Sequence, residues 1–448
     1  MSSIPASLTA WVRRLREDEI SWTFARNASG AFVIGGLGQL AGFLVLLPLA
    51  HLMGVESYGI YLYVAAWLQV ATMLAGMGIP NAAQRFVPEY LATGREAECG
   101  SFLGWANRRV LANSLLLSAA GLLTLGLLHS RISPETLWTG VIAALALPLA
   151  SGVMLRSRLL LALKETLRAK LVDSFRMPLA VGAAVLIFWM ADARLSAAAA
   201  MVAQAASALL ALVVLGAWLR RGLHSAVSPG RRSEARKLWR GVAGSLFFIG
   251  AMGMIMSQAD TLMLGAMRGT TEAGIYRTAS RLAMLPAFGL SAANTITAPL
   301  ISELYSQGRM ADLQRLATLS ARALFGLISG AGLCLLLAGK FVLGLFGPAF
   351  TTGYLALAFL TIGQMVNGFC GPVALLMTLT GGHDTAARVF LAAAALNILL
   401  NSILIPSHGG IGAAVSTTSS LVLWNVVLVV LVQRRLNIQS VAIAMLRV

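Results

Sequence analysis

Apolar stretches of about 20 residues recur along the whole chain, each long enough to cross a hydrocarbon core roughly 30 Å thick. They are continuous rather than alternating, which favours helices, because lipid offers backbone polar groups no partner outside a helix or a closed barrel. Of the 448 residues 58% are hydrophobic and 11% are charged, against about 25% charged in soluble domains. The sequence therefore predicts an all-α protein that crosses a membrane many times.

Twelve spans can be delimited, and a basic connection at 220–240 separates the sixth from the seventh. This connection divides the chain into two predicted six-helix bundles, 28–219 and 241–432. The spans are 28–52, 61–80, 108–128, 137–160, 172–190, 197–219, 241–265, 275–298, 318–338, 353–379, 387–405 and 411–432.

A polar leader, 1–27, precedes the first span, and a tail, 433–448, follows the last. The leader has no apolar stretch with a cleavage site, so we expect no cleavable signal. One helical face carries its apolar residues Leu8, Trp11, Val12 and Leu15, which predicts an amphipathic helix at the cytosolic interface. With the N-terminus inside, 28 of the 34 lysines and arginines fall on the cytosolic side. This asymmetry predicts that both termini lie in the cytoplasm.

The two halves share sequence. Glu56–Tyr61 and Thr271–Tyr276 both end in Gly-Ile-Tyr, 215 residues apart. Pro88–Arg95 and Ser302–Arg309 both contain Glu-x4-Gly-Arg, 214 residues apart. Because each half has an even number of spans, the repeat predicts a pseudo-two-fold axis along the membrane normal and a two-bundle transporter.

No enzyme or metal motif is present among the five histidines and three cysteines. The net charge of +17 reflects topology, so we expect no nucleic-acid partner. Neither an ATP-binding motif nor any other cofactor site is recognisable, so transport would draw on a proton or sodium gradient or on the substrate's own gradient. Two Gly-x3-Gly pairs, Gly38/Gly42 and Gly326/Gly330, predict closely packed helix faces.

Charges within spans cost roughly 2.5–3.5 kcal/mol on insertion scales, so they should face a cavity or a partner. Asp260 is the one acid deep within a predicted span, and Arg277 and Arg281 share a face of the next span. We expect an Asp260–Arg281 contact, either as a structural ion pair or as an ion-binding or gating element. Arg85, at the inner end of span two, either lines the cavity mouth or extends to the interface.

Uncharged amides also occur within or beside spans, where contact with lipid would be unfavourable. They should therefore face other helices or a wet cavity between the bundles. The candidate substrate-binding residues are Arg85, Arg277, Arg281, Asn294, Gln364, Asn367, Asn397 and Asn401.

Such a cavity would suit a sugar attached to a lipid. Each hydroxyl transferred to alkane without a partner costs about 4–8 kcal/mol, so an oligosaccharide does not cross unaided. A hydrated, amide-lined chamber lowers this barrier while the lipid tail stays in the membrane. Arginine suits a pyrophosphate because its guanidinium can bond two oxygens at once.

Two segments carry a family resemblance. The stretch from Gly59-Ile60-Tyr61 to Arg85–Tyr90, and Asn397–Pro406 with Gly409–Ala414, resemble polysaccharide-transport proteins of the multidrug/oligosaccharidyl-lipid/polysaccharide (MOP) exporter superfamily. The resemblance implies a MATE-like fold and a Wzx-type flippase of the bacterial inner membrane. Its substrate would be an undecaprenyl-pyrophosphate-linked oligosaccharide of O-antigen or exopolysaccharide synthesis. A glycan polymerase and a chain-length regulator are the protein partners it implies.

Three alternatives remain open. A multidrug/cation antiporter of the same fold would favour acids over arginines in its cavity. A peptidoglycan lipid-precursor flippase has nearly the same chemistry, although relatives of that kind often carry helices beyond the twelfth. A membrane scaffold of a glycan-synthesis complex would not need the internal repeat or the polar spans.

Overall fold

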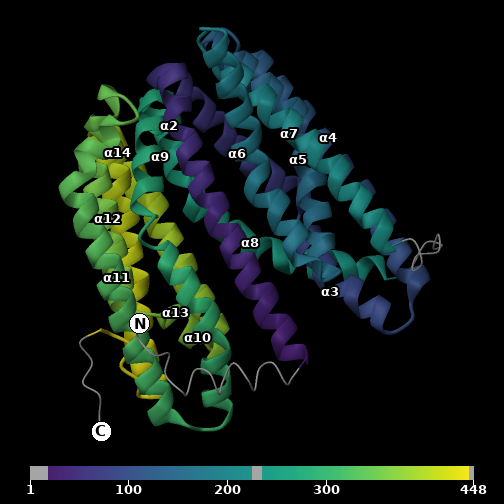
Figure 1. Cartoon of the computed structure of the whole chain (residues 1–448), viewed down its shortest axis with the longest axis vertical. Helices are drawn as coiled ribbons and strands as arrows, with labels where there is room; N and C mark the ends of the chain where they lie inside the picture. The colour runs from purple at the N-terminus through teal and green to yellow at the C-terminus, as the bar shows by residue number, and fades with distance from the viewer. Residues whose placement is uncertain (1–18, 224–234, 443–448) are drawn as a thin grey trace, which may run out of the picture.

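The computed structural model describes residues 19–223 and 235–442, and helices account for most of them (Figure 1). The predicted interfacial helix around Leu8–Leu15 and the middle of the predicted linker 220–240 lie outside the described residues. Within the described ranges the secondary structure is helical, with no strand. The predicted all-α membrane architecture is therefore confirmed.

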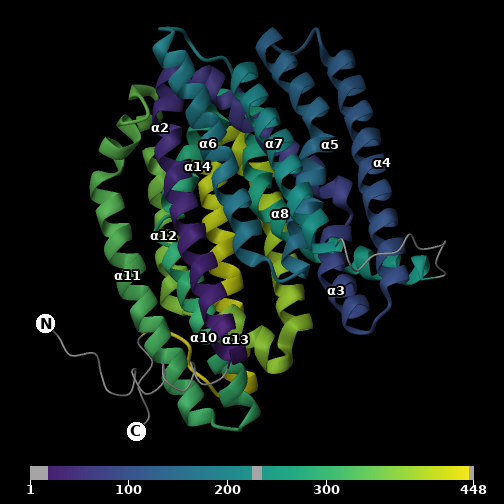
Figure 2. The same ribbon diagram turned by 45° about the vertical axis from the view of Figure 1, so that its right-hand side comes forward.

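Each half of the chain forms one bundle, and α2 and α8 lie where the bundles meet (Figures 1 and 2). The first bundle contains α2 (Glu19–Gly76), α3 (Ile79–Ala92), α4 (Glu96–Leu128), α5 (Pro134–Ala162), α6 (Thr166–Met190) and α7 (Ala197–Leu223). The second contains α8 (Arg236–Arg268), α9 (Thr270–Ala283), α10 (Phe288–Ser306), α11 (Met310–Gly344), η1 (Pro348–Gly353), α12 (Tyr354–Cys370), α13 (Val373–Met377), η2 (Thr378–Gly382) and α14 (His383–Leu436).

The predicted spans all have helical counterparts, but two pairs are joined and two spans are divided. Predicted span ten, 353–379, is divided between α12 and α13 at Gly371 and Pro372. In the described part of the chain, nine helical segments are long and apolar enough to cross a membrane. Two of these hold two predicted spans each, because α2 bends at Gly54 and α14 at Gly409, both with positive φ. Predicted span eight, 275–298, is interrupted near Pro286 and becomes α9 and α10. Proline cannot donate the helical hydrogen bond, which accounts for this break.

The internal repeat is visible in the backbone. Gly54 and Gly269, five residues before each Gly-Ile-Tyr, have φ 72° and 101° and ψ 167° and 161°. In the second repeated block, Gly94 and Gly308 have φ 68° and 69°. These conformations suit glycine, which lacks Cβ. The same turns therefore recur at the same sequence offsets, as expected if the halves are related.

The two repeated glycines meet where the bundles touch. A Cβ atom on Gly274 of α9 would stand 2.5 Å from the Cα of Gly59 on α2. Beside them Tyr58 of α2 packs edge-to-face on Phe350 of η1, with ring centroids 5.6 Å apart. Gly59 and Gly274 follow the bends that reverse the chain, so this contact lies at the end opposite to where the described chain begins and ends (Figure 1). That end is the predicted periplasmic one.

The two Gly-x3-Gly pairs behave differently. A Cβ on Gly38 would lie 2.4 Å from Cβ of Ser174, so α2 and α6 pack closely there, as predicted. A Cβ on Gly326 or Gly330 of α11 would have no neighbour within 4 Å. The prediction of a close helix contact at Gly326/Gly330 is therefore wrong within this chain, because that face of α11 points away from the other helices.

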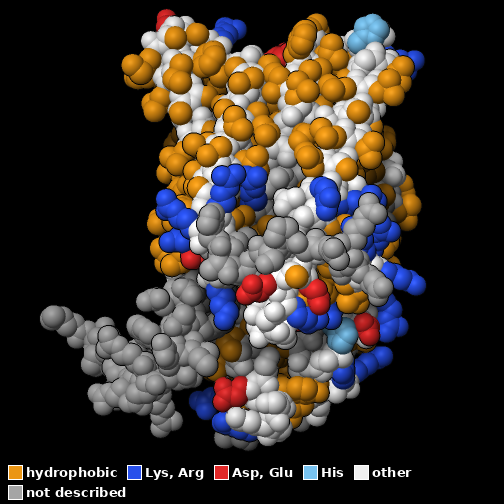
Figure 3. Space-filling view, turned by 90° about the vertical axis from the view of Figure 1, so that its right-hand side faces the viewer, with side chains coloured by type: hydrophobic (Ala, Val, Ile, Leu, Met, Phe, Trp, Pro, Cys, Tyr) orange, Lys and Arg blue, Asp and Glu red, His pale blue; other side chains and the backbone are white. Residues whose placement is uncertain are grey.

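The outer surface separates apolar from basic side chains. On the face formed by the first bundle, hydrophobic side chains fill the upper part, and lysines and arginines gather below them (Figure 3). Large apolar residues are widely exposed, such as Leu116 at 70% and Leu337 at 83%. Such exposure is stable in contact with lipid chains, and the basic belt marks the level of lipid headgroups.

Candidate functional site

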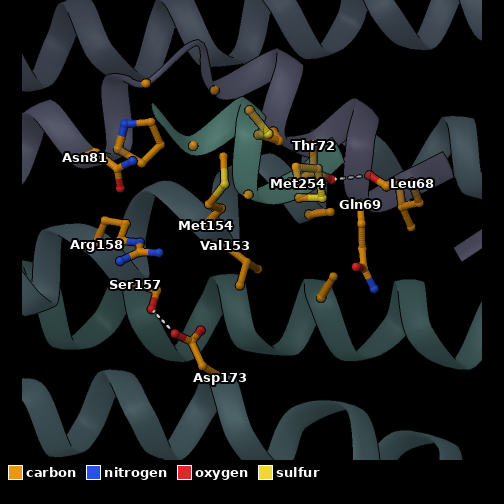
Figure 4. Close-up of a pocket in the computed structure, with 18 of the residues that line it drawn as sticks. Leu68, Gln69, Thr72, Asn81, Val153, Met154, Ser157, Arg158, Asp173 and Met254 are labelled. Carbon is orange, nitrogen blue, oxygen red and sulfur yellow. Dashed lines mark hydrogen bonds between the residues drawn. The ribbon is translucent and has the colours of Figure 1, made fainter. Parts of the chain in front are cut away.

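A cavity of about 560 Å³ lies between α2, α3, α5, α6, α7 and α8. Its walls combine methionine and leucine side chains with amides and hydroxyls (Figure 4). On α2, Gln69 and Thr72 face it, and Gln204 reaches it from α7. Its lining residues Arg158 and Asp173 lie near the connection between α5 and α6, so the cavity occupies the predicted cytosolic half.

Two arginines give this cavity its charge. Arg158 comes from α5 and Arg176 from α6, and both line the cavity beside Asp173. The Asp173 carboxylate accepts a hydrogen bond of 2.7 Å from Ser157 (Figure 4). Among the described residues, neither arginine forms an ion pair with Asp173. The guanidinium donors can therefore bind an anion that enters the cavity.

A second cavity of about 310 Å³ lies between α2, α6 and α9. It is lined by Gln39, by Tyr61 and by the predicted Arg281. Gln69 lines both cavities, so the two adjoin there. Its Oε1 accepts a hydrogen bond of 2.7 Å from Gln258 of α8, which links the bundles. Because the two cavities adjoin, Arg281 is a third arginine close to the first cavity, which we call the central cavity.

The other predicted cationic residues lie elsewhere. Arg277 donates a hydrogen bond of 2.9 Å to the main-chain carbonyl of Ser257, a residue that lines the first cavity. Arg85 is exposed on α3, where its guanidinium lies 5.5 Å from the ring centre of Phe86. Arg85 lines neither cavity.

The predicted amides divide into separate groups. Asn294 of α10 is half-buried, and its Oδ1 has no hydrogen-bond partner within the described residues. Asn367 donates to Gln364 at 3.3 Å and accepts from Asn425 at 3.2 Å, forming a chain between α12 and α14. This chain is inside the second bundle and not in the wall of either cavity. It satisfies buried amides that would otherwise destabilise the helix contact.

Asp260 is the centre of a buried polar cluster. Its carboxylate accepts hydrogen bonds from Tyr276 at 2.6 Å, from Asn401 at 2.7 Å and from Thr417. Asn397 links the cluster by accepting from Asn401 at 3.1 Å and donating to Thr417 at 3.2 Å. The side chains come from α8, α9 and both arms of α14, so distant segments of the second bundle converge here.

The expected Asp260–Arg281 ion pair is not among those formed by the described residues. Asp260 is 6% exposed and points into the second bundle, whereas Arg281 faces the second cavity. Although the two residues lie on consecutive helices, α8 and α9, their side chains point in different directions. The Asp260 carboxylate bonds instead to Tyr276, Asn401 and Thr417.

Arg158, Arg176 and Gln204 were not expected at the site. The two arginines entered the sequence analysis only as cytosolic charges that fix topology. Each nevertheless lies within a predicted span, Arg158 in 137–160 and Arg176 in 172–190. Such positions are the signal that could have identified them, because a charge at membrane depth needs a cavity or a partner.

Comparisons with known proteins agree with this architecture. A family model described as polysaccharide biosynthesis protein matches residues 24–305. A probable flippase, AglR of Haloferax volcanii, is 29% identical over 180 residues, which is 39% of this chain and 38% of the relative. The chain thus matches less than half of that relative's length.

Solved structures show the same fold at low sequence identity. The lipid II flippase MurJ in an inward closed conformation superposes with a TM-score of 0.69, at 14% identity, over 90% of this chain and 87% of MurJ. An inward-facing multidrug resistance MATE transporter of the MOP superfamily gives a TM-score of 0.65, at 14% identity, over 92% and 94% of the two chains. The predicted MOP fold and family resemblance are confirmed, and the chain belongs to the polysaccharide biosynthesis protein family.

Proposed function

We propose that this protein is a flippase that moves undecaprenyl-pyrophosphate-linked oligosaccharide repeat units, of O-antigen or exopolysaccharide type, from the cytoplasmic to the periplasmic leaflet. The observation that carries the proposal is the cavity between the bundles, which presents Arg158 and Arg176 beside amides and hydroxyls. Guanidinium groups would pair with the pyrophosphate, and the amides would hydrate the glycan. A glycan polymerase and a chain-length regulator would receive the product outside.

The charge of the cavities favours an anionic substrate over the organic cations of a multidrug antiporter. Arg158, Arg176 and Arg281 line the two cavities, and Asp173 is the acidic side chain in their described walls. The net positive charge would repel a cation and attract a phosphate. A peptidoglycan lipid precursor carries the same pyrophosphate, so it remains the second candidate substrate.

The position of the cavity supports alternating access. The Gly59–Gly274 contact closes the bundles together at the predicted periplasmic end, and the cavity lies on the other side of it. The substrate would therefore enter from the cytoplasmic leaflet. Separation of α2 from α9 at these glycines, as one bundle rocks on the other, would open the opposite side.

The Asp260 cluster would bind a coupling cation, either sodium or a proton. Asp260 is buried without an ion pair among the described residues, and the buried Oδ1 of Asn401 has no partner there. Carboxylate, amide and hydroxyl oxygens are the ligands that hard cations prefer. Because α8, α9 and α14 all contribute, cation binding would change the packing of the second bundle.

Transport by reconstituted protein tests the proposed function. Purified protein is placed in vesicles that carry either the lipid-linked repeat unit or the peptidoglycan precursor, and exposure of the head group on the far side is followed with a membrane-impermeant enzyme. We expect protein-dependent movement of the repeat unit and little of the precursor. The reverse preference would establish the second candidate, and movement of neither, with expulsion of a cationic dye, would establish the antiporter.

A further inference from the structure

A groove outside the central cavity is formed by α4, α5 and α7. It has a volume of about 920 Å³ and is lined by Asn107 of α4, Arg156 of α5 and Arg220 of α7, together with apolar residues. On α5, Arg156 is two residues from Arg158, about 200° around the helix at 100° per residue. Arg158 faces the central cavity and Arg156 faces this groove. The α4–α7 groove is therefore a separate site on the other side of α5.

The side chain of Arg156 is held in place by α7. Its guanidinium donates a hydrogen bond to the main-chain carbonyl of Leu212. The approach depends on Gly216, because a Cβ there would stand 2.9 Å from Nη1 of Arg156. A guanidinium has five N–H donors, so the bond to Leu212 leaves donors that can face the groove.

The described walls of the groove bring positive charge together. Arg156 and Arg220 both line it, and none of its described lining residues is aspartate or glutamate. Two like charges in one groove repel each other, so an anion bound between them would be stabilised. Asn107 adds a neutral hydrogen-bonding group to the same wall. Together, the two guanidinium groups and the amide can donate hydrogen bonds to the oxygens of a phosphate diester.

The groove also lies at the depth of a lipid headgroup. Arg156 is six residues before the end of α5 at Ala162, or about 9 Å at 1.5 Å per residue. The basic side chains of this face gather below its apolar band (Figure 3). Toward the apolar band, Leu111 of α4 lies one turn from Asn107 and Leu209 of α7 lies one turn from Val213, and each is 52% exposed. Acyl chains that extend from a headgroup in the groove would cover these side chains.

We propose that the α4–α7 groove binds the phosphate headgroup of an anionic phospholipid from the membrane leaflet on the predicted cytosolic side. Arg156 and Arg220 contact the phosphate, and the acyl chains lie along the exposed leucines of α4 and α7. The site does not depend on the transported substrate. A basic residue near an anionic lipid contributes about 1 kcal/mol, which corresponds to about a fivefold change in affinity.

The test measures lipid binding to the purified full-length protein by native mass spectrometry. Phosphatidylglycerol, phosphatidylcholine and inorganic phosphate are titrated separately, and phosphate is also added in competition. We expect phosphatidylglycerol to bind more tightly than phosphatidylcholine and to resist competition by phosphate. Arg156→Gln and Arg220→Gln should each weaken phosphatidylglycerol binding about fivefold, in line with about 1 kcal/mol per basic residue.

Matched variants separate this site from general surface charge. Arg109→Gln removes an exposed charge from the same region of α4 but does not alter the groove lining, so its binding should stay as in the wild type. Gly216→Ala keeps both arginines and displaces the Arg156 guanidinium, so it should weaken binding. Equal loss in Arg109→Gln, equal affinity for both phospholipids, or full displacement by phosphate would each overturn the proposal. Because Arg220 is exposed, its variant remains informative should Arg156→Gln fail to fold.

Discussion

At the scale of single residues, three arginines in similar sequence surroundings acquire different environments. Arg156, Arg158 and Arg176 all stand near the predicted cytosolic ends of apolar stretches. Helical periodicity places Arg156 and Arg158 on nearly opposite faces of α5, so the sequence could have separated them. It could not show which face meets the cavity, because that depends on how α5 packs against α6 and α7. The same limit explains why Arg281 was expected to pair with Asp260, whereas it lines the second cavity.

Replacing the two cavity arginines tests their proposed role in binding the pyrophosphate. Arg158→Gln and Arg176→Gln remove charge-assisted hydrogen bonds, each worth about 1.5–3 kcal/mol. We expect each variant to transport the lipid-linked substrate at least about tenfold more slowly in vesicles. Arg158→Lys and Arg176→Lys should be intermediate, since lysine keeps the charge but loses the planar fork. Wild-type rates in both glutamine variants would remove these arginines from the mechanism.

Asp260→Asn tests the proposed coupling site. The substitution keeps the shape of the side chain but removes the charge that would bind a cation. Transport should lose its response to an imposed sodium or proton gradient, as measured in vesicles with each gradient applied in turn. Asp312→Asn is the matched control, because Asp312 forms an exposed ion pair with Arg309 at 2.8 Å, and such pairs contribute little. An unchanged gradient response in Asp260→Asn would show that the cluster is only structural.

At the scale of helices, the glycines of the repeated motifs set the backbone geometry. Gly94 and Gly308 each end a helix, and the following Arg95 and Arg309 pair with an acid three residues later. These turns were detectable from the repeat, because their residues recur in both halves. The contact between Gly59 and Gly274 was not, since a repeat offset indicates equivalent positions without indicating that they touch. A symmetry axis that passes between equivalent residues brings them together, and this required the assembled fold.

Gly274→Ala tests whether this crossing of α2 and α9 matters for transport. The added Cβ would stand 2.5 Å from the Cα of Gly59, so the helices must move apart. We expect transport to fall at least about tenfold, equivalent to about 1.4 kcal/mol or more, with normal membrane insertion. Gly330→Ala adds the same methyl group where nothing lies within 4 Å, and its transport should match the wild type. Equal activity of the two variants would contradict a role for the crossing in closure.

At the scale of the whole molecule, hydropathy was sufficient for the architecture. Each predicted span has a helical counterpart, because lipid imposes a minimum apolar length on every crossing. What hydropathy could not predict is where helices continue through a bend, as in α2 and α14, because this depends on backbone conformation at Gly54 and Gly409. The position of the cavity could not be predicted from the sequence either, since it depends on the angle between the bundles. Hydropathy therefore gave no reason to choose Gln69, which lines the cavity, over Gln364 and Asn367, which bond to each other within the second bundle.

The orientation of the molecule follows from charge and can be tested by labelling. Ser130 lies between α4 and α5, at the end with few lysines and arginines, and Ser306 lies at the other end, beside Gly308; both are exposed. In a Cys334→Ser background, which leaves the buried Cys99 and Cys370, a membrane-impermeant maleimide applied to intact cells should label Ser130→Cys. It should label Ser306→Cys only after the cells are permeabilised. The excess of lysine and arginine in short loops resists translocation, so 28 of 34 such residues on one side should retain that side in the cytoplasm. The opposite labelling pattern would show that the molecule is inserted the other way round. The central cavity, with Arg158 and Arg176, would then lie on the side that receives the product.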